Sequence, residues 1–492
     1  MSNNSNNNSQ IDNISNESYY GIIPLVKKDK IYGFWDVFLV TGAWAIATWA
    51  YVQGGEIAAV LGLKQSLSSI FFGMALAGLV ISLCVVITTR YGIDIWIYQK
   101  ALLGYLGLII FAVIMLATQL GYDVINTEVF ASSVIKIMGA SGIHLSDSWT
   151  PWIATICALL GLWIALRGPI AVRNATRIMV PMLLLIGVII LATVFTKFSF
   201  SELLQVKPLY ANEYGSNHES YMVVTEWNIA FIFGWFASIG VVSRLTKTER
   251  KSYWGHFGGF TFIMASFVSI GVITALAMLA ATGTESVDPT DWLLELGGPV
   301  LSILSLIFIS IANITTVAVS LYGIAISTKV LKPNLKFKYV TTFWAGWIVV
   351  LIFWGGIWEY YHVFLALLGA TAGPIVALIL VDFFLIRKSK VSLKALYKVK
   401  GNDAYNYTKG INIPAVLSFV VGIIGYLFVY EPFEGVPRNS IFLYTTGTGF
   451  GMIVSGAFYY ILSLIPPVKR YLLQDQIQEE DEKVIYSKVK AK

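Results

Sequence analysis

Long apolar segments separated by short polar ones run through almost the whole chain. They lack the strict alternation of polar and apolar positions seen in β-barrel strands, and most reach the roughly 20 residues that a membrane-spanning helix needs. The pattern therefore predicts an all-α integral membrane protein. Its twelve transmembrane helices are expected near residues 33–63, 67–89, 105–138, 148–166, 171–196, 227–244, 256–282, 298–327, 340–357, 360–386, 412–431 and 440–466.

The composition narrows the class further. Hydrophobic residues make up 57% of the 492 positions and charged residues 13%, about half of the roughly 25% charge in ordinary soluble domains. A soluble enzyme or a disordered scaffold is excluded by this shortage of polar surface. The net charge of +6 comes from cations dispersed over short loops rather than gathered into a patch, which excludes a nucleic-acid partner.

The distribution of lysine and arginine predicts the orientation. Cytoplasmic loops of membrane proteins are enriched in these cations. Twelve spans with both termini cytoplasmic leave very few of the 34 cations on the outer side, namely Lys64, Lys136, Lys197, Lys207 and Arg438. We therefore expect a disordered cytoplasmic tail over 1–32, a transporter domain over 33–466 and a cytoplasmic tail over 467–492, in a multi-pass protein of the plasma membrane.

Glycines interrupt the first and sixth apolar segments. Residues 33–63 would form a helix of about 46 Å, longer than a hydrocarbon core of about 30 Å. This segment contains Gly42 and Gly54–Gly55, with the polar residues Thr48 and Gln53 between them. Residues 227–244 carry a similar interruption, with Trp235 and Ser238 among the glycines. Glycine also serves simple close packing in membranes, but broken helices that carry polar residues indicate a binding cavity.

Polar residues also gather in the third and eighth segments. Gln119, Tyr122 (or Asp123) and Asn126 share one helical face, and a carboxyl group inside a span is a functional candidate by default. Asp123 could bind a cationic substrate, carry a proton or form a structural pair. The eighth segment places Asn313, Thr315 and Thr316 within one turn. Their oxygens suit a hard monovalent cation, although a threonine also often bonds back to its own helix.

Catalytic signatures are absent from the sequence. We find no phosphate-binding GxxxxGK[ST] loop, no HExxH motif and no nucleophile–histidine–carboxylate order. Cys84 and Cys157 lie in apolar segments and predict neither a disulfide framework nor a metal site. We therefore expect no enzyme activity and no cofactor. A membrane-embedded enzyme or a transport-like receptor is the least favoured interpretation.

Several motifs together resemble the nucleobase:cation symporter family of cytosine, purine, uracil, allantoin, hydantoin and thiamine permeases. The resemblance covers roughly residues 33–466. Its motifs are GAWAIATWAYVQGGEIAAVLGL in the first segment, TQLGY in the third, GWFASIG in the sixth, ANITT in the eighth and GPIVALILVDFFLIRK in the tenth, the last with Pro374, Asp382 and Arg387. Their order and spacing carry the resemblance more than any single motif does.

The resemblance implies an inverted repeat of five plus five helices with two extra helices. It also implies a sodium ion bound by carbonyls of Gly42 and of Ala45 or Ile46, by the carbonyl of Ala312, and by the hydroxyls of Thr315 and Thr316. A planar substrate would lie between Tyr122 and Trp235, beside Phe236, with Gln119 and Ser238 at its polar edge. Gln53, next to the glycine pair, is a further candidate substrate contact.

The chain departs from the family pattern at three places. Family members often have tryptophan at the position of Tyr122, and Asp123 is not expected of the nucleobase permeases. Members also commonly have an asparagine soon after the hydroxyl pair of the eighth segment, where this chain reads VAVSLYG. These departures leave the substrate open, including a larger or cationic one such as thiamine. The leading hypothesis is a monomeric symporter that imports a small heterocycle with sodium. The alternative is proton coupling through Asp123 or Glu56, with another small solute such as an amino acid.

Overall fold

The computed structural model describes residues 23–45, 47–397, 404–478 and 480, and almost all of its regular structure is helical. Two groups of five membrane segments can be recognised along the chain. The first consists of α2 (Phe34–Ala45) with α3 (Thr48–Val60), α4 (Leu63–Tyr91), α5 (Ile95–Ala140), α6 (Thr150–Leu166) and α7 (Pro169–Lys197). The second consists of α9 (Asn217–Phe233) with η3 (Gly234–Ser238) and α10 (Ile239–Ser243), α11 (Glu249–Gly258) with η4 (Gly259–Met264) and α12 (Ala265–Thr282), α14 (Pro299–Leu331), α15 (Phe337–Trp354), and α17 (Tyr361–Leu380) with η5 (Val381–Ile386).

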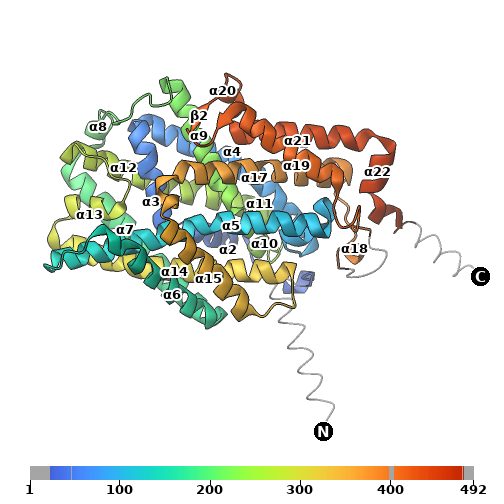
Figure 1. Ribbon diagram of the computed structural model, residues 1–492, viewed down its shortest axis with the longest axis horizontal. Helices are drawn as coiled ribbons and strands as arrows, with labels where there is room; N and C mark the ends of the chain where they lie inside the picture. The colour runs from blue at the N-terminus through green and yellow to red at the C-terminus, as the bar shows by residue number, and fades with distance from the viewer. Residues whose placement is uncertain (1–22, 46, 398–403, 479, 481–492) are drawn as a thin grey trace, which may run out of the picture.

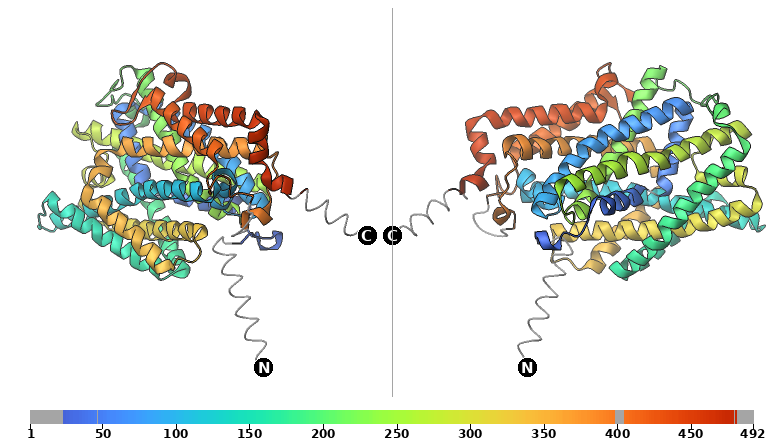
Figure 2. Two further views of the ribbon diagram at one scale, coloured as in Figure 1. Left: turned by 45° about the vertical axis from the view of Figure 1, so that its right-hand side comes forward. Right: turned by 180° about the vertical axis from the view of Figure 1, so that it is seen from behind.

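Two further long helices follow, and short elements join the segments. The long pair is α19 (Ile413–Val429) and α21 (Gly447–Leu464), which pack on each other and on α17 at one edge of the bundle (Figures 1 and 2). The short elements are η1 (Lys27–Asp29), η2 (Asp147–Trp149), α8 (Phe200–Leu203), α13 (Pro289–Gly297), α16 (Gly356–Glu359), α18 (Leu393–Tyr397), α20 (Phe442–Thr445), α22 (Pro466–Leu472), and the antiparallel strands β1 (Tyr430–Glu431) and β2 (Val436–Pro437).

Every apolar segment predicted from the sequence coincides with a helix. In the described part of the chain, ten helices are long and apolar enough to cross a membrane, and the bent pair α2–α3 gives an eleventh span. The remaining segment corresponds to α19, whose 17 residues make it a shorter apolar helix. The all-α membrane class is therefore confirmed, whereas the exact count of twelve spans is not.

The two groups of five pack in equivalent ways. Helix α3 of the first span packs on α12 of the seventh, and α9 of the sixth span packs on α4 of the second. Exchanging each span with the one five places later turns the first contact into the second. The same exchange relates the contacts of α14 with α6 and α7 to those of α5 with α15 and α17. Because each repeat contains an odd number of spans, the second repeat is inverted relative to the first.

Both repeats begin with a broken helix. The axes of α2 and α3 differ by 65°, and Ala47 between them is extended, with φ −146° and ψ 164°. In the sixth span, the 3₁₀ segment η3 separates α9 from α10. These breaks coincide with the glycine-interrupted segments of the sequence. Backbone groups that leave the α-helical pattern at membrane depth need other partners, so both breaks mark the centre of the bundle as the candidate binding region.

The described ends of the chain lie at the same end of the bundle. Figure 1 shows α18 and α22 there, with α8 and α13 at the opposite end. Part of the predicted N-terminal tail is packed rather than free: Leu25 N donates to Gly92 O, Tyr32 N donates to Leu245 O, and the buried Lys30 ammonium donates to Thr89 O. The expectation of a disordered tail up to residue 32 is thus wrong for Leu25 to Tyr32, and residues 1–22 lie outside the described residues.

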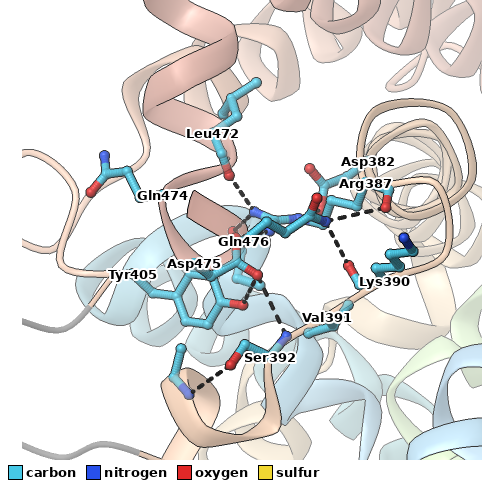
Figure 3. A network of polar contacts seen from close by, with 12 residues as sticks. Asp382, Arg387, Lys390, Val391, Ser392, Tyr405, Leu472, Gln474, Asp475 and Gln476 are labelled. Atoms are coloured by element: carbon cyan, nitrogen blue, oxygen red, sulfur yellow. Dashed lines mark hydrogen bonds and ion pairs between the residues drawn. The ribbon is translucent and has the colours of Figure 1, made fainter. Parts of the chain in front are cut away.

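An ionic cluster ties the C-terminal segment to the bundle (Figure 3). Arg387, fully buried, lies 2.7 Å from Asp382 and 2.6 Å from Asp475, and it also donates to the carbonyl of Leu472. The carboxylates have further partners, since Tyr98 and Tyr459 donate to Asp382 and Tyr405 donates to Asp475. The first part of the predicted tail 467–492 is therefore anchored in the protein.

Candidate functional site

Aromatic side chains from both broken spans meet at the centre of the bundle. Trp49 of α3 lies with its ring centroid 5.4 Å from Tyr122 of α5, 5.0 Å from Phe231 of α9 and 5.3 Å from Trp235 of η3. Trp44, just before the break in the first span, also stacks on Trp235, with ring centroids 5.8 Å apart. The helix breaks thus bring these rings together at one level of the bundle, whereas in straight helices they would lie at different levels.

Tyr122 and Trp235 form a nearly parallel pair. Their planes differ by 10° and their centroids are 6.0 Å apart. Gly234 makes room for this arrangement, because a Cβ atom at that position would lie 2.7 Å from the Tyr122 hydroxyl oxygen. A planar ring held between two others needs a spacing of about 7 Å, since each stacked contact takes about 3.5 Å. Because the 6.0 Å joins ring centroids, it is an upper limit on the spacing of the two planes, and the pair must widen by at least about 1 Å to admit a flat ligand.

Two of the predicted polar contacts lie beside this pair. Gln119 Nε2 is 3.3 Å from Ser238 Oγ, so the amide and the hydroxyl expected at the edge of a substrate do meet. Trp235 and Ser238 are partly exposed. An amide and a hydroxyl side by side offer both donors and acceptors, which suits the edge of a heterocycle.

Gln53 lies one turn beyond Trp49 in a different polar layer. Its amide oxygen accepts a 2.7 Å hydrogen bond from the Tyr361 hydroxyl, and its nitrogen is 3.4 Å from Asn228 Oδ1. All three side chains are fully buried or nearly so. Gln53 therefore joins the first, sixth and tenth spans at a level beyond the aromatic cluster.

Three of the predicted cation ligands lie together on α14. The hydroxyls of Thr315 and Thr316 both donate to the carbonyl of Ala312, over 2.8 and 2.9 Å. On the first span, Gly42 faces η4, where a Cβ atom would clash with Ile263, and Ala45 is the last residue of α2. Ile46 lies outside the described residues. The structure thus gathers the oxygens of α14 and places the end of α2 at the helix break.

Comparisons with known proteins show the family of the chain. The family model of permeases for cytosine/purines, uracil, thiamine and allantoin matches residues 27–444. The chain belongs to this permease family. Similar proteins include the purine-uracil permease NCS1 of Arabidopsis thaliana, 25% identical over 67% of this chain and 55% of the relative, and the allantoin permease of Bacillus subtilis (strain 168), 28% identical over 46% and 45%. The chain thus spans about half the length of these curated relatives, which are transporters rather than enzymes.

Solved structures show the same fold. Mhp1, a nucleobase-cation-symport-1 family transporter, was solved in a closed conformation with bromovinylhydantoin bound; it is 18% identical, with a TM-score of 0.72 over 92% of this chain and 95% of Mhp1. Its inward-facing conformation is 17% identical, with a TM-score of 0.76 over 92% and 93%. A Na⁺-coupled sialic acid symporter is 14% identical, with a TM-score of 0.62 over 91% and 92%. The permease is therefore a multi-pass membrane protein with an inverted repeat.

Phe236 does not join the aromatic pair in the permease. Its fully buried ring contacts Trp96 and Phe111 at 6.5 and 6.4 Å between centroids. Neighbouring residues of a 3₁₀ segment point about 120° apart. Trp235 therefore faces the centre while Phe236 faces the packed side, and the prediction that Phe236 contacts the substrate is not supported by its position.

Asp123 is buried close to the site but faces a different helix from Tyr122. Its Oδ2 accepts a 2.7 Å hydrogen bond from the Ser320 hydroxyl of α14, the one polar partner of Asp123 in the part of the permease that the structure describes. A buried carboxylate usually pairs with a cation or several donors. Asp123 therefore remains available for a proton or a positively charged ligand.

Three polar residues that lie in separate segments of the sequence form a link that sequence reasoning missed. The Thr48 hydroxyl lies 2.8 Å from Asn126 Oδ1 and 2.6 Å from Asn313 Oδ1. These side chains come from α3, α5 and α14, and all are buried. Their polarity inside apolar segments was the available signal, but positions so far apart in the chain gave no indication that they meet.

Proposed function

We propose that the permease is a secondary transporter that imports a small planar heterocycle, such as a nucleobase, allantoin or thiamine, together with sodium. The observation that carries this proposal is the parallel Tyr122–Trp235 pair at the two helix breaks. Family membership and the bound heterocycle named for Mhp1 support the same substrate class. We place the protein in the plasma membrane with both termini cytoplasmic, as the lysine and arginine distribution favours.

The substrate ring would lie between Tyr122 and Trp235. Aromatic faces stabilise a flat π-system through stacking and exclusion of water. Gln119 and Ser238 would then exchange their mutual 3.3 Å contact for hydrogen bonds to the ring's polar edge. Because a substrate without matching donors and acceptors would leave these groups unpaired, this edge supplies selectivity.

Sodium would bind at the Ala312 carbonyl and the Thr315 and Thr316 hydroxyls of α14, together with carbonyls from the end of α2. The Thr315 and Thr316 hydroxyl oxygens lie 2.8 and 2.9 Å from the Ala312 carbonyl oxygen. Carbonyls freed at the end of α2 would complete an all-oxygen site. The same helix break carries Trp44 and Trp49 of the aromatic cluster. A cation that fixes the break therefore also orders the substrate site, which couples the two binding events.

Alternating access would follow from movement of one part of the bundle against the other. The Gln53–Tyr361–Asn228 layer closes the bundle on one side of the aromatic cluster, whereas Trp235 and Ser238 are partly exposed. Since both repeats and the whole site belong to one chain, a monomer contains everything that transport needs. Lipid and the coupling cation are then its partners, besides the substrate.

Asp123 supports a second candidate for the driving ion. A buried carboxylate whose described partner is a single hydroxyl is suited to take up and release a proton, as carboxylates of proton-driven transporters do. A proton symporter for another small solute such as an amino acid would use Asp123 or Glu56 in this way. This mechanism predicts uptake that follows a pH gradient and ignores sodium.

Uptake into proteoliposomes tests the proposal. Purified protein is reconstituted, and labelled cytosine, hypoxanthine, uracil, allantoin and thiamine are offered with and without an inward sodium gradient. We expect one of these heterocycles to accumulate when the gradient is present. Accumulation that depends on the pH gradient alone would replace sodium by the proton, and transport of none of them under either gradient would contradict the substrate class.

A further inference from the structure

The Thr48–Asn126–Asn313 link contains more acceptor oxygens than it has protons to donate to them. The Thr48 hydroxyl has a single proton, yet both amide oxygens lie within hydrogen-bond distance of its Oγ1, at 2.8 and 2.6 Å. It can donate to one of them only. The other oxygen then faces the hydroxyl oxygen with no proton between them, although all three side chains are at most 1% exposed.

The amide nitrogens add to this imbalance. Nδ2 of Asn126 and Nδ2 of Asn313 are both buried and have no acceptor among the residues that the structure describes. Turning one amide over would give Thr48 a donor, but the NH₂ group of the other amide would still lack an acceptor. A buried polar group without a partner is destabilising. A purely structural link would be expected to avoid this cost.

Three neutral oxygens that converge at one point suit a hard monovalent cation. Hard cations take hydroxyl, amide and carbonyl oxygens as ligands, and a cation at this point would satisfy both amide oxygens and the hydroxyl oxygen together. A divalent ion or a transition metal would need carboxylate, imidazole or thiolate ligands, and the described chain has no cluster of three such residues. Sodium is therefore the chemically matched ligand.

The cluster is separate from the threonine pair of α14. Asn313 follows Ala312 directly, but its side chain faces α3 and α5, whereas the Thr316 hydroxyl faces α7, 3.1 Å from Met179 Sδ. Thr48 is the first residue after the helix break, and Trp49 beside it belongs to the aromatic cluster. An ion here would join the break to both α5 and α14.

We propose that Thr48 Oγ1, Asn126 Oδ1 and Asn313 Oδ1 form a second sodium site, which is distinct from the site at Ala312, Thr315 and Thr316. This inference goes beyond the proposed function, because the permease would bind two cations. The ion would hold α3, α5 and α14 in one arrangement around Trp49. Its release would free the first span to move relative to the two long helices.

Equilibrium binding of ²²Na⁺ to the purified full-length permease tests this site. We expect two sodium ions per molecule in the wild type and one in Thr48→Val, which keeps the shape of the side chain but removes the hydroxyl. Thr88→Val is the matched control, because Thr88 is an equally buried threonine whose hydroxyl contacts Ser243 at 2.5 Å. This control should bind two ions, and an unchanged number in Thr48→Val would overturn the inference.

Thr316→Val separates this inference from the proposed function. It should remove one ion by removing a hydroxyl at the other site. If Thr316→Val binds as many ions as the wild type while Thr48→Val loses one, the sodium site of the proposed function fails and the second site stands. If only Thr316→Val loses an ion, the second site fails and the proposed function stands.

A charge-gain variant keeps the test valid even if Thr48→Val does not fold. In the Thr316→Val background, Asn313→Asp replaces the neutral oxygen by a carboxylate. Opposite charges at contact distance attract each other, so the remaining sodium should bind about tenfold more tightly. Unchanged or weaker binding in this double variant would contradict a cation at Asn313.

Discussion

Two buried polar regions of the permease differ in how completely their groups are paired. At the end of the bundle that carries α18 and α22, Arg387 contacts two carboxylates, and each of these also accepts a hydrogen bond from at least one tyrosine. At the centre, Asp123 has one hydroxyl partner and the amide nitrogens of Asn126 and Asn313 have no described acceptor. Fully hydrogen-bonded groups hold helices together, whereas we propose that the incompletely hydrogen-bonded groups of equal burial bind the ion or the substrate.

This comparison separates stability from function. Burying a charge is tolerated only when it is paired and hydrogen-bonded, so the Arg387 cluster contributes most to a single, well-defined fold. The central region gives up some of that stability to keep donors and acceptors free. Variants of the Arg387 cluster should therefore lower thermal stability, whereas variants of the central region should weaken ligand binding.

The largest effect is expected at Arg387. Arg387→Met leaves Asp382 and Asp475 as buried carboxylates without their cation, which costs about 3–5 kcal/mol. We expect a strongly reduced yield of folded protein and a lower melting temperature in detergent, measured by thermal unfolding. Arg438→Met is the control, because Arg438 pairs with Glu431 at an exposed position and such pairs contribute about 0–1 kcal/mol. Normal stability of Arg387→Met would show that the cluster is not structural.

The next largest effect is expected at Trp235, and it should be seen in ligand binding rather than in thermal stability. Trp235→Ala removes one face of the stacked site, and an aromatic stack on a base contributes about 1–3 kcal/mol. Affinity for the heterocycle should fall roughly 5- to 150-fold in a binding titration, with little change in melting temperature. Trp152→Ala is the control, since Trp152 is exposed on the surface of α6. Equal affinities of Trp235→Ala and the wild type would contradict the stacking model.

Asp123 allows a sharper test of the central region. Asp123→Asn keeps a polar group opposite Ser320 but removes the negative charge. If sodium drives transport, sodium-dependent uptake of a neutral heterocycle should persist within a few-fold, while binding of a cationic ligand such as thiamine should weaken. Loss of all concentrative uptake, together with loss of its pH dependence, would assign the coupling to Asp123 instead.

The smallest effect is expected at Gly234. A Cβ atom there would lie 2.7 Å from the Tyr122 hydroxyl and 3.0 Å from Leu368, so Gly234→Ala should displace the tyrosine ring and weaken heterocycle binding a few-fold. Tyr122→Phe removes the nearest clashing atom. The double variant should therefore bind more tightly than Gly234→Ala alone, and additive losses in the two variants would show that the glycine does not position this ring.

The sequence predicts much of the fold because each membrane helix is determined by the composition of its own segment. Apolar length marks the spans, and glycines with polar neighbours mark the breaks at Thr48 and Trp235. It also predicts that Tyr122 meets Trp235 and that Gln119 meets Ser238, since the family resemblance aligns these positions. The helix α19 is the exception: its 17 residues fall just short of an unambiguous span.

Other features could not be predicted, because they depend on contacts between distant segments. Phe236 follows Trp235 directly in the sequence, and only the local backbone of η3 decides which of the two rings faces the centre. Thr48 meets Asn126 and Asn313 across separations of 78 and 265 residues. The charged composition of the C-terminal segment suggested a tail, but the pairing of Asp475 with Arg387 anchors it in the protein.

The most direct test of the account is the sodium dependence of heterocycle binding. The heterocycle that accumulates in proteoliposomes is titrated into the purified permease by calorimetry, without sodium and at saturating sodium. Reciprocal coupling of about 1–3 kcal/mol predicts that sodium tightens binding about 5- to 150-fold, and that Trp235→Ala weakens binding under both conditions. An affinity that is the same with and without sodium would contradict a shared site for ion and substrate at the helix breaks.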